Sequence, residues 1–257
     1  MPPGSTFCGS PPFTQGWVAP NSPAMSALVL RPYQREAIGA VIAARKRGVQ
    51  RMVVCLPTGA GKTVIFSELA RLARRQVLVL AHRSELLSQA QAKLQAAVGP
   101  ERVVAIEQAD ERAPKDAHIV VCSIRSLHEE RLRRLIRDRD VGLILYDECH
   151  HSVADDNIRV LTDLGCFDKG WTGTLLGFTA TTNRADGKGL DAVFEDIVYQ
   201  RSIGQMMDEG WLVRLRGYRV ATSADLSGLS TGGLDFREDE LAEAVDIEER
   251  NALVARS

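Results

Sequence analysis

From Leu28 onward, short apolar runs alternate with segments that have the hydrophobic period of an α-helix. The runs are rich in Val, Ile and Leu at consecutive positions, which predicts strands that are buried on both faces. They are Met52–Leu56, Val77–Ala81, Val103–Glu107, Ile119–Ser123, Val141–Tyr146 and Leu175–Thr179. Amphipathic segments lie between them, at Thr63–Arg74, Ser84–Val98 and Glu129–Arg137. This alternation predicts an α/β fold with a mostly parallel sheet and helices on both faces.

The composition limits the classes of protein to which the chain can belong. Its 257 residues are 45% hydrophobic and 25% charged, as is usual for a chain with a buried core. The net charge of -1 excludes attachment to nucleic acid through bulk positive charge, although a local basic surface remains compatible with it. The apolar runs are far shorter than the roughly 20 residues of a membrane helix, so we expect no membrane association. Five cysteines without a CxxC pair are typical of reduced core thiols and predict a cytoplasmic location.

The beginning of the chain differs from the rest. Residues 1–27 hold six of the ten prolines, and no Lys, Arg, Asp or Glu precedes Arg31. They lack the features of a signal or transit peptide, and they carry too little apolar surface to offset the entropy of ordering. We therefore expect a disordered leader, with Met25 as an alternative start. We expect one domain over residues 28–203, then a closing helix, a strand at Leu212–Ala221 and a linker over residues 204–257.

A glycine-containing loop joins the run at Met52–Leu56 to the amphipathic segment that follows. Glycines let several backbone N–H groups turn toward one anion, and a helix N-terminus adds partial positive charge. Lys62 can reach the β- and γ-phosphates of a nucleotide, and the Thr63 hydroxyl can bind Mg²⁺. The full G-x-x-x-x-G-K-[ST] pattern would have glycine in place of Leu56, and the alternative is a glycine turn with a surface lysine. We predict a phosphate-binding loop made of Pro57, Thr58, Gly59, Ala60, Gly61, Lys62 and Thr63.

A pair of acidic residues follows the run at Val141–Tyr146. Open α/β sheets bind their ligands at the carboxyl ends of the strands, where this pair would face the phosphate loop. Asp147 fits a Mg²⁺ ligand that acts through water, because Mg²⁺ usually takes one or two carboxylates together with phosphate oxygens. Glu148 can orient the attacking water as a general base. The alternative is a solvated acidic pair at the end of a strand.

Five motifs give the chain a family likeness. They are Leu30-Arg31-Pro32-Tyr33-Gln34, the phosphate loop, Ala81-His82-Arg83-Ser84-Glu85-Leu86, Asp147-Glu148-Cys149-His150 and Gly177-Phe178-Thr179-Ala180-Thr181. In this order they resemble a superfamily 2 helicase of the DEAD/DEAH type, in the branch of type III restriction subunits, excision-repair helicases and RadD-like proteins. The likeness spans about Leu28 to Ser257 and implies a RecA-like P-loop NTPase lobe, the first of the family's two. Thr182 stands where relatives usually have proline, and Arg125 where many have glutamine.

The resemblance implies roles for residues beyond the phosphate loop. Arg31 would stack on the adenine face of ATP, and Gln34 would pair with the adenine edge. The residues that would couple the ATP site to the nucleic-acid face are His150, Thr179 and Thr181. For the two threonines, ordinary strand packing is the alternative. The residues that would contact nucleic-acid phosphates are Arg83, Ser123 and Arg125, for which plain surface positions are the alternative.

The implied activity is a nucleic-acid-dependent ATPase, a helicase or translocase, in which Lys62, Asp147 and Glu148 act on Mg-ATP. We expect DNA rather than RNA as the partner. Family members receive arginine fingers from a second RecA-like lobe, so this chain would need that lobe in cis or in trans and would hydrolyse ATP poorly alone. One alternative is an orphan lobe or split-helicase subunit that binds ATP or DNA without turnover. Another is a different P-loop class, such as a small-molecule kinase or a transport ATPase.

Overall fold

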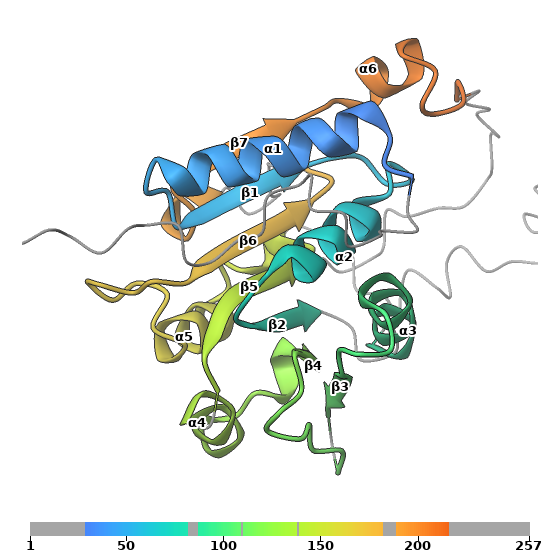
Figure 1. Ribbon diagram of the computed structural model, residues 1–257. Helices are drawn as coiled ribbons and strands as arrows, with labels where there is room; N and C mark the ends of the chain where they lie inside the picture. Colours follow the sequence, from blue (N-terminus) through green and yellow to red (C-terminus); the bar gives the residue numbers. More distant parts are fainter. Residues whose placement is uncertain (1–28, 82–86, 109, 138, 182–188, 216–257) are drawn as a thin grey trace, which may run out of the picture. The chain divides into compact units, whose positions relative to one another are not determined.

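The computed structural model describes residues 29–81, 87–108, 110–137, 139–181 and 189–215 (Figure 1). In these ranges seven strands form one sheet in the order β3-β4-β2-β5-β6-β1-β7, and all the paired strands are parallel. The strands are β1 (Arg51–Cys55), β2 (Gln76–Ala81), β3 (Val104–Glu107), β4 (Ile119–Ser123), β5 (Val141–Asp147), β6 (Thr174–Thr179) and β7 (Asp196–Gln200). The predicted parallel α/β architecture is thereby confirmed.

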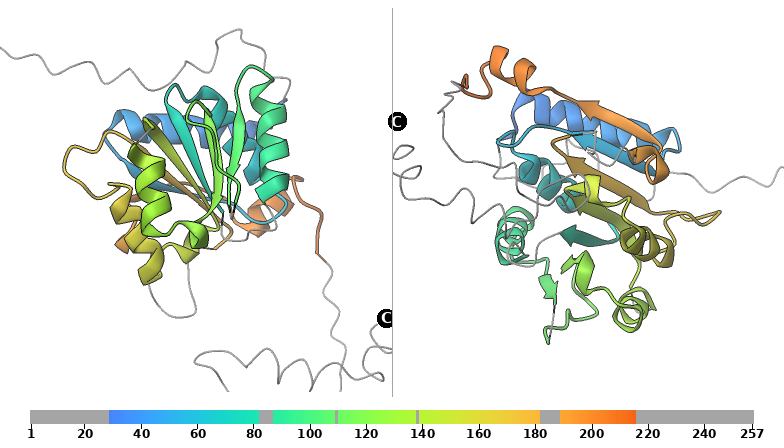
Figure 2. Two further views of the ribbon diagram at one scale, coloured as in Figure 1. Left: turned by 90° about the horizontal axis from the view of Figure 1, so that it is seen from below. Right: turned by 180° about the vertical axis from the view of Figure 1, so that it is seen from behind.

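Helices cover both faces of this sheet (Figure 2). Neighbouring strand residues point to opposite faces, so Met52 and Val54 join one core while Val53 joins the other. The first core is covered by α1 (Pro32–Lys46), α2 (Lys62–Leu72) and α3 (Leu87–Val98), and the second by α4 (Glu129–Arg137) and α5 (Asp155–Asp163). Burial of each large aliphatic side chain contributes about 1.5–3 kcal/mol, which explains why consecutive apolar residues mark these strands.

The order of the strands decides which segments meet at the carboxyl edge of the sheet. β6 lies between β1 and β5, with Cys55 opposite Thr179 and Asp147 opposite Phe178. The segments that leave these three strands are the predicted phosphate loop, the acidic pair and the Thr179–Thr181 motif. Parallel strands end at the same edge, so the sheet places three motifs that are distant in sequence next to one another.

The secondary structure differs from the prediction at several places. All six predicted strands are present, with ends shifted by no more than one residue, while α1, α5 and the edge strand β7 were not predicted. The strand predicted at Leu212–Ala221 is wrong for residues 212–215, because the Leu212 amide donates to the Met206 carbonyl after α6 (Ile203–Asp208) instead of to a neighbouring strand. The remainder of that predicted strand, the leader over residues 1–27 and Arg83 lie outside the described residues.

The chain divides into two compact units. The first comprises residues 1–183 and 188–212, and the second comprises residues 184–187 and 213–257. The first unit includes α6, whose Met206 is fully buried in the core. The domain end expected at residue 203 coincides with the first residue of this helix. Within the described ranges, none of the helices combines the length and the apolar character needed to cross a membrane.

Candidate functional site

The predicted phosphate loop follows β1 and leads directly into α2, whose first two residues are Lys62 and Thr63. Gly59 and Gly61 have φ angles of 83° and 72°, in the left-handed region that favours glycine. The Lys62 ammonium folds back over the loop, and its Nζ donates to the Leu56 carbonyl at 3.2 Å. The Leu56 side chain is fully buried, so the family's glycine is replaced here by a residue that packs into the core. The loop therefore keeps its turn and its lysine despite this departure.

The start of α1 lies against this loop. The Tyr33 hydroxyl donates to the Ala60 carbonyl at 2.7 Å, and both residues are buried. Gln34 is only 4% exposed, and its Nε2 would lie 2.8 Å from a Cβ placed on Gly61. Its Oε1 accepts from the Arg31 backbone N–H at 2.9 Å. The structure thus places the buried Gln34 against the phosphate loop, and Tyr33 lies between this loop and Arg31.

The acidic pair stands at the end of β5. The Asp147 carboxylate accepts from the Glu148 backbone N–H at 3.1 Å, and Glu148 has a φ of 51°, which is unusual for a residue with a side chain. Burial, and then the charge of Glu148, raise the pKa of Asp147 above its ordinary value of 3.8, while Lys62 and His150 act in the opposite direction. Because desolvation and a like charge destabilise the ionised form of this partly buried carboxylate, a bound cation would stabilise it.

The residues that could hold Mg²⁺ are Thr63 and Asp147. The described residues contain no cluster of three or more His, Cys, Asp or Glu side chains suited to a metal. Mg²⁺ does not require such a cluster, because it keeps several waters and takes one or two carboxylates with phosphate oxygens. The partly buried acid beside the phosphate loop therefore fits Mg²⁺ bound together with a nucleotide, and does not fit a metal held by protein alone.

The three predicted coupling residues meet in one hydrogen-bonded group. The His150 Nδ1 lies 3.1 Å from the Thr179 hydroxyl and 3.4 Å from the Glu148 carboxylate. The Thr179 hydroxyl donates to the Thr181 carbonyl at 2.7 Å and accepts from the Thr181 N–H at 3.2 Å. Thr179 is fully buried. These contacts link the acidic motif on β5 to the end of β6.

The residues predicted to contact nucleic acid are only partly brought together. Ser123 ends β4 and is 4% exposed, with its carbonyl accepting from the Ser126 hydroxyl at 2.8 Å. Arg125 follows in a short 3₁₀ turn (Ile124–Ser126) and is exposed. Of the two predicted contact residues that the structure describes, Arg125 is exposed and Ser123 is buried.

Two further features of the structure were not predicted from the sequence. Trp211 follows α6 and lies against the start of α1, with the Arg31 guanidinium 5.7 Å above its ring. The sequence signal for the position of Trp211 is Gly210, whose φ of 76° ends α6 and turns the following apolar residues back onto the core.

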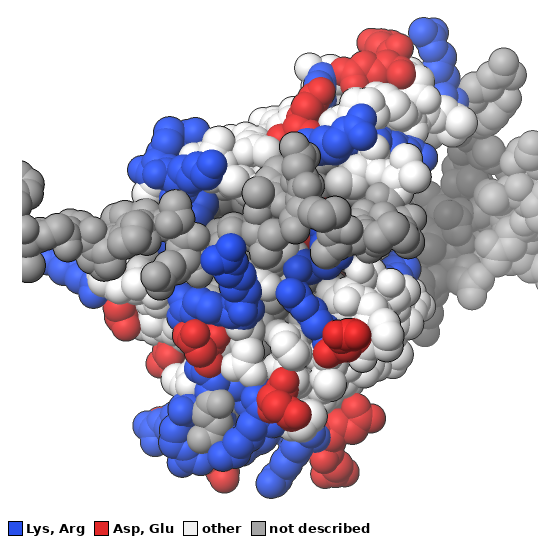
Figure 3. All heavy atoms as spheres, viewed as in Figure 1, with Lys and Arg blue, Asp and Glu red and all other residues white. Residues whose placement is uncertain are grey.

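Figure 3 shows basic side chains gathered around α4, yet Arg131 and Arg134 of this helix turn inward and pair with the fully buried Glu107.

Comparison with known proteins adds a family. Residues 27–184 match the family described as "Type III restriction enzyme, res subunit". A Saccharomyces cerevisiae protein named as an ATP-dependent helicase, IRC3, is 35% identical over 245 residues, which are 90% of this chain and 35% of that protein. A Schizosaccharomyces pombe protein named as a mitochondrial ATP-dependent helicase, irc3, is 34% identical over 206 residues, 78% of this chain and 34% of that protein. The chain thus spans about a third of the length of these curated relatives.

A solved structure has the same fold. The Hef helicase domain of Pyrococcus furiosus superposes with a TM-score of 0.54 at 22% identity, over 74% of this chain and 43% of that one. At this level of identity the likeness concerns the fold.

Proposed function

The chain belongs to the type III restriction enzyme res subunit family of superfamily 2 helicases, and we propose that it binds Mg-ATP and couples ATP hydrolysis to movement along nucleic acid. One observation carries this proposal. With β6 between β1 and β5, the phosphate loop, the acidic pair and the Thr179 group share one edge of the sheet. An ATPase that drives movement along nucleic acid needs phosphate binding, water activation and coupling of the ATP site to the nucleic-acid face to lie side by side.

Different residues at this edge of the sheet would bind the phosphates, bind Mg²⁺ and orient the attacking water. The backbone of the loop and Lys62 would hold the β- and γ-phosphates, because oriented N–H groups and a cation stabilise their charge. Thr63 and Asp147 would hold Mg²⁺, which neutralises charge on the phosphates. Glu148 would orient the attacking water, and His150, whose Nδ1 lies 3.4 Å from the Glu148 carboxylate, would pass the state of the site to Thr179.

Binding of ATP is tested with the purified chain by isothermal titration calorimetry in the presence of Mg²⁺. We expect Lys62→Ala to weaken ATP binding on the order of tenfold or more, since it removes a charge-assisted contact to phosphate. Lys93→Ala is the matched control, because Lys93 is an exposed lysine of α3 that belongs to none of the five motifs. Equal affinity of Lys62→Ala and wild type, or a folded wild-type chain that binds no ATP, would overturn the proposal.

The nucleic-acid partner and the second lobe are further parts of the proposal. We favour DNA, because the matching family is named for a restriction enzyme. Arg83, Ser123 and Arg125 are the proposed contacts, and Arg125→Ala should weaken DNA binding at low salt. We expect ATP turnover to rise when a second RecA-like lobe is added in trans, since that lobe supplies arginine fingers. Strong DNA-stimulated turnover by these 257 residues alone would contradict this dependence, whereas binding without any rescue would favour the orphan-lobe alternative.

The cellular location is part of the same proposal. A cytoplasmic location follows from the reduced thiols expected from the sequence, whereas the Schizosaccharomyces pombe relative is named as mitochondrial. Fractionation of cells that produce the untagged protein separates the two compartments.

A further inference from the structure

Trp211 and Leu212 form one wall beside the phosphate loop. The Arg31 guanidinium lies 5.7 Å from the centre of the Trp211 ring, within the range of a cation–π contact. The Tyr33 ring meets Trp211 edge to face, with centroids 5.3 Å apart. Leu212 Cδ2 would lie 3.3 Å from a Cβ placed on Gly59, so this segment touches the loop itself. Both residues are partly buried against the core formed by α1, α2 and α3.

The end of α6 holds this wall in place. The backbone N–H groups of Trp211 and Leu212 both donate to the Met206 carbonyl, at 2.9 and 3.0 Å. Met206 is fully buried, and Gly210 supplies the left-handed turn that lets the chain double back. The position of the Trp211 ring is therefore set by a buried anchor and two backbone hydrogen bonds.

A second set of contacts ties α6 to α1. Arg201, which follows β7, reaches Glu36 of α1 at 3.0 Å and Glu209 at the end of α6 at 2.5 Å. The Tyr199 hydroxyl also donates to Glu36, at 2.9 Å. Arg201 thus bridges α1 and the end of α6, two residues before Trp211 in the chain.

From this geometry we propose that Trp211 is a positioning residue for recognition of the adenine base, acting through Arg31. The inference rests on the ATP site proposed above. An arginine side chain has many rotamers, and fixing it before the ligand arrives lowers the entropy lost on binding. The Trp211 ring lies under the Arg31 guanidinium at 5.7 Å, and the Tyr33 hydroxyl accepts from Arg31 Nη1 at 3.4 Å. Arg31 itself is exposed, so the held guanidinium offers a planar cation to a purine ring.

The proposal separates recognition of the base from recognition of the phosphates. The loop, Lys62 and Asp147 bind the triphosphate, and Trp211 contacts none of these through the interactions described above. Loss of the indole should therefore weaken ATP binding but leave binding of inorganic tripolyphosphate, which has no base, unchanged. A residue that merely stabilised the fold of the loop would affect both ligands alike.

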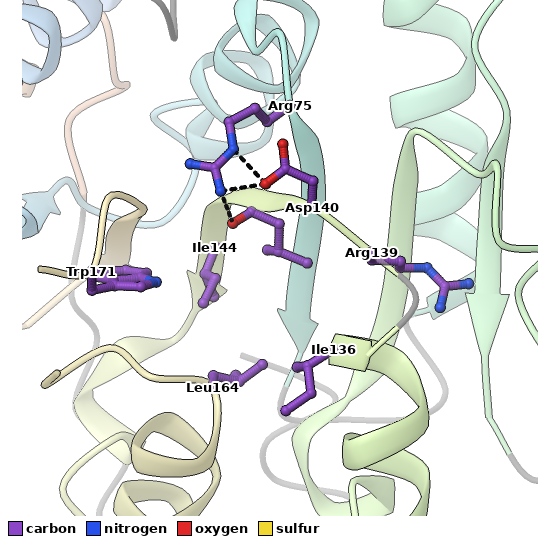
Figure 4. Close-up of a pocket in the computed structure, with 8 residues that line it drawn as sticks. Arg75, Ile136, Arg139, Asp140, Ile144, Leu164 and Trp171 are labelled. Atoms are coloured by element: carbon purple, nitrogen blue, oxygen red, sulfur yellow. Dashed lines mark hydrogen bonds and ion pairs between the residues drawn. The ribbon is translucent and has the colours of Figure 1, made fainter. Parts of the chain in front are cut away.

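The test compares the affinities of the 257-residue chain for Mg-ATP and Mg-tripolyphosphate by calorimetry. We expect Trp211→Ala to weaken ATP binding on the order of fivefold to tenfold, as for loss of a partly desolvated cation–π contact, with tripolyphosphate affinity held within about twofold. Trp211→Phe keeps an aromatic face and should restore most of the ATP affinity. Trp171→Ala is the matched control, because this half-buried indole lines a pocket beside the start of β5 with Arg75 and Asp140 (Figure 4).

A double-mutant cycle tests the route through Arg31. If Trp211 acts through that residue, Arg31→Ala combined with Trp211→Ala should bind ATP no more weakly than Arg31→Ala alone. Should Trp211→Ala fail to fold, Trp211→Leu carries the test, because it keeps apolar contact and lacks the aromatic face.

The possible outcomes distinguish this inference from the proposed function. Unchanged ATP affinity in Trp211→Ala, or an equal loss for ATP and tripolyphosphate, overturns the role of Trp211 while the ATP site stands. Additive effects of the two substitutions overturn the route through Arg31. A folded wild-type chain that binds neither ligand overturns the ATP site and this inference together.

Discussion

The Nδ1 of His150 lies 3.1 Å from the hydroxyl oxygen of Thr179, which joins the acidic motif to the neighbouring strand. The Thr179 hydroxyl also donates to the Thr181 carbonyl at 2.7 Å and accepts from the Thr181 N–H at 3.2 Å. The Thr179 carbonyl also accepts from the Leu56 N–H at 3.0 Å, at the start of the phosphate loop. One residue thus contacts both the loop and the acidic motif.

Replacing Thr179 by valine tests how much this group stabilises the fold. Valine keeps the shape of threonine but removes the hydroxyl that lies against the His150 Nδ1 and accepts from the Thr181 N–H. We expect the free energy of unfolding to fall by about 0.5–1.5 kcal/mol in urea denaturation, because hydrogen bonds of the buried Thr179 hydroxyl are lost at a partly buried site. Thr179→Ser retains the hydroxyl and is the control. Equal stability of the valine and serine variants would show that the hydrogen bonds are not needed.

A methyl group on Gly61 tests the strain of the phosphate loop. Gly61 has a φ of 72°, and a Cβ there would also lie 2.8 Å from Gln34 Nε2. Gly61→Ala should therefore lower the free energy of unfolding by about 1–2 kcal/mol and weaken ATP binding. Gly39→Ala, in α1 with nothing within 4 Å of the added Cβ, should instead raise stability by about 0.5–1 kcal/mol. A Gly61→Ala protein as stable as wild type would contradict the assigned loop conformation.

The buried strands were readable from the sequence because both of their faces are apolar. Val77–Ala81 carries that signal in every residue and Ile119–Ser123 in every residue but the last, and the short motifs after Met52–Leu56 and Val141–Tyr146 gave the phosphate loop and the acidic pair. β7 gave no such signal, because its residues are exposed or half exposed at the edge of the sheet. In α1 the inward face includes Ala37 and Ala44, whose small side chains make a weak hydrophobic period.

Contacts between distant residues were beyond the reach of sequence patterns. The period of α4 predicts an amphipathic helix, but it gives no indication that Arg131 and Arg134 turn toward a carboxylate on β3. Likewise, nothing local to Trp211 names Arg31 and Tyr33 as its neighbours, since α1 lies far earlier in the chain. Pairings of this kind are decided by tertiary packing.

The pairing of Glu107 provides a prediction about stability. Its carboxylate is fully buried, contacts Arg134 and Arg131, and accepts from the Ala113 N–H at 2.9 Å. Glu107→Ala leaves two partly buried guanidinium groups without their anion, so the free energy of unfolding should fall by about 3–5 kcal/mol. The exposed pair of Arg133 and Glu129 is the control, and Arg133→Ala should cost less than about 1 kcal/mol. Similar losses in both variants would mean that the burial of Glu107 does not matter.

The buried cysteines give a prediction about alkaline pH. Burial raises the pKa of the Cys166 thiol to about 12, and it raises the pKa values of Cys55, Cys122 and Cys149 above the ordinary 9.0 as well. The folded state therefore keeps protons that the unfolded state loses, so stability from these thiols is complete below pH 9.0 and declines above it. For Cys166, each pH unit between 9 and 12 should lower the free energy of unfolding by roughly 1.4 kcal/mol.

Urea denaturation at several pH values, with wild type beside Cys166→Ala, isolates the contribution of one thiol. The stability advantage of wild type over the variant should be constant up to about pH 9 and shrink above it, because only wild type carries the thiol whose pKa is raised. In a Cys8→Ser background, which removes the one cysteine outside the described residues, an aromatic disulfide reagent should react slowly at pH 8 until denaturant is added. A fast reaction of the native protein, or a constant difference up to pH 11, would contradict the burial of these thiols.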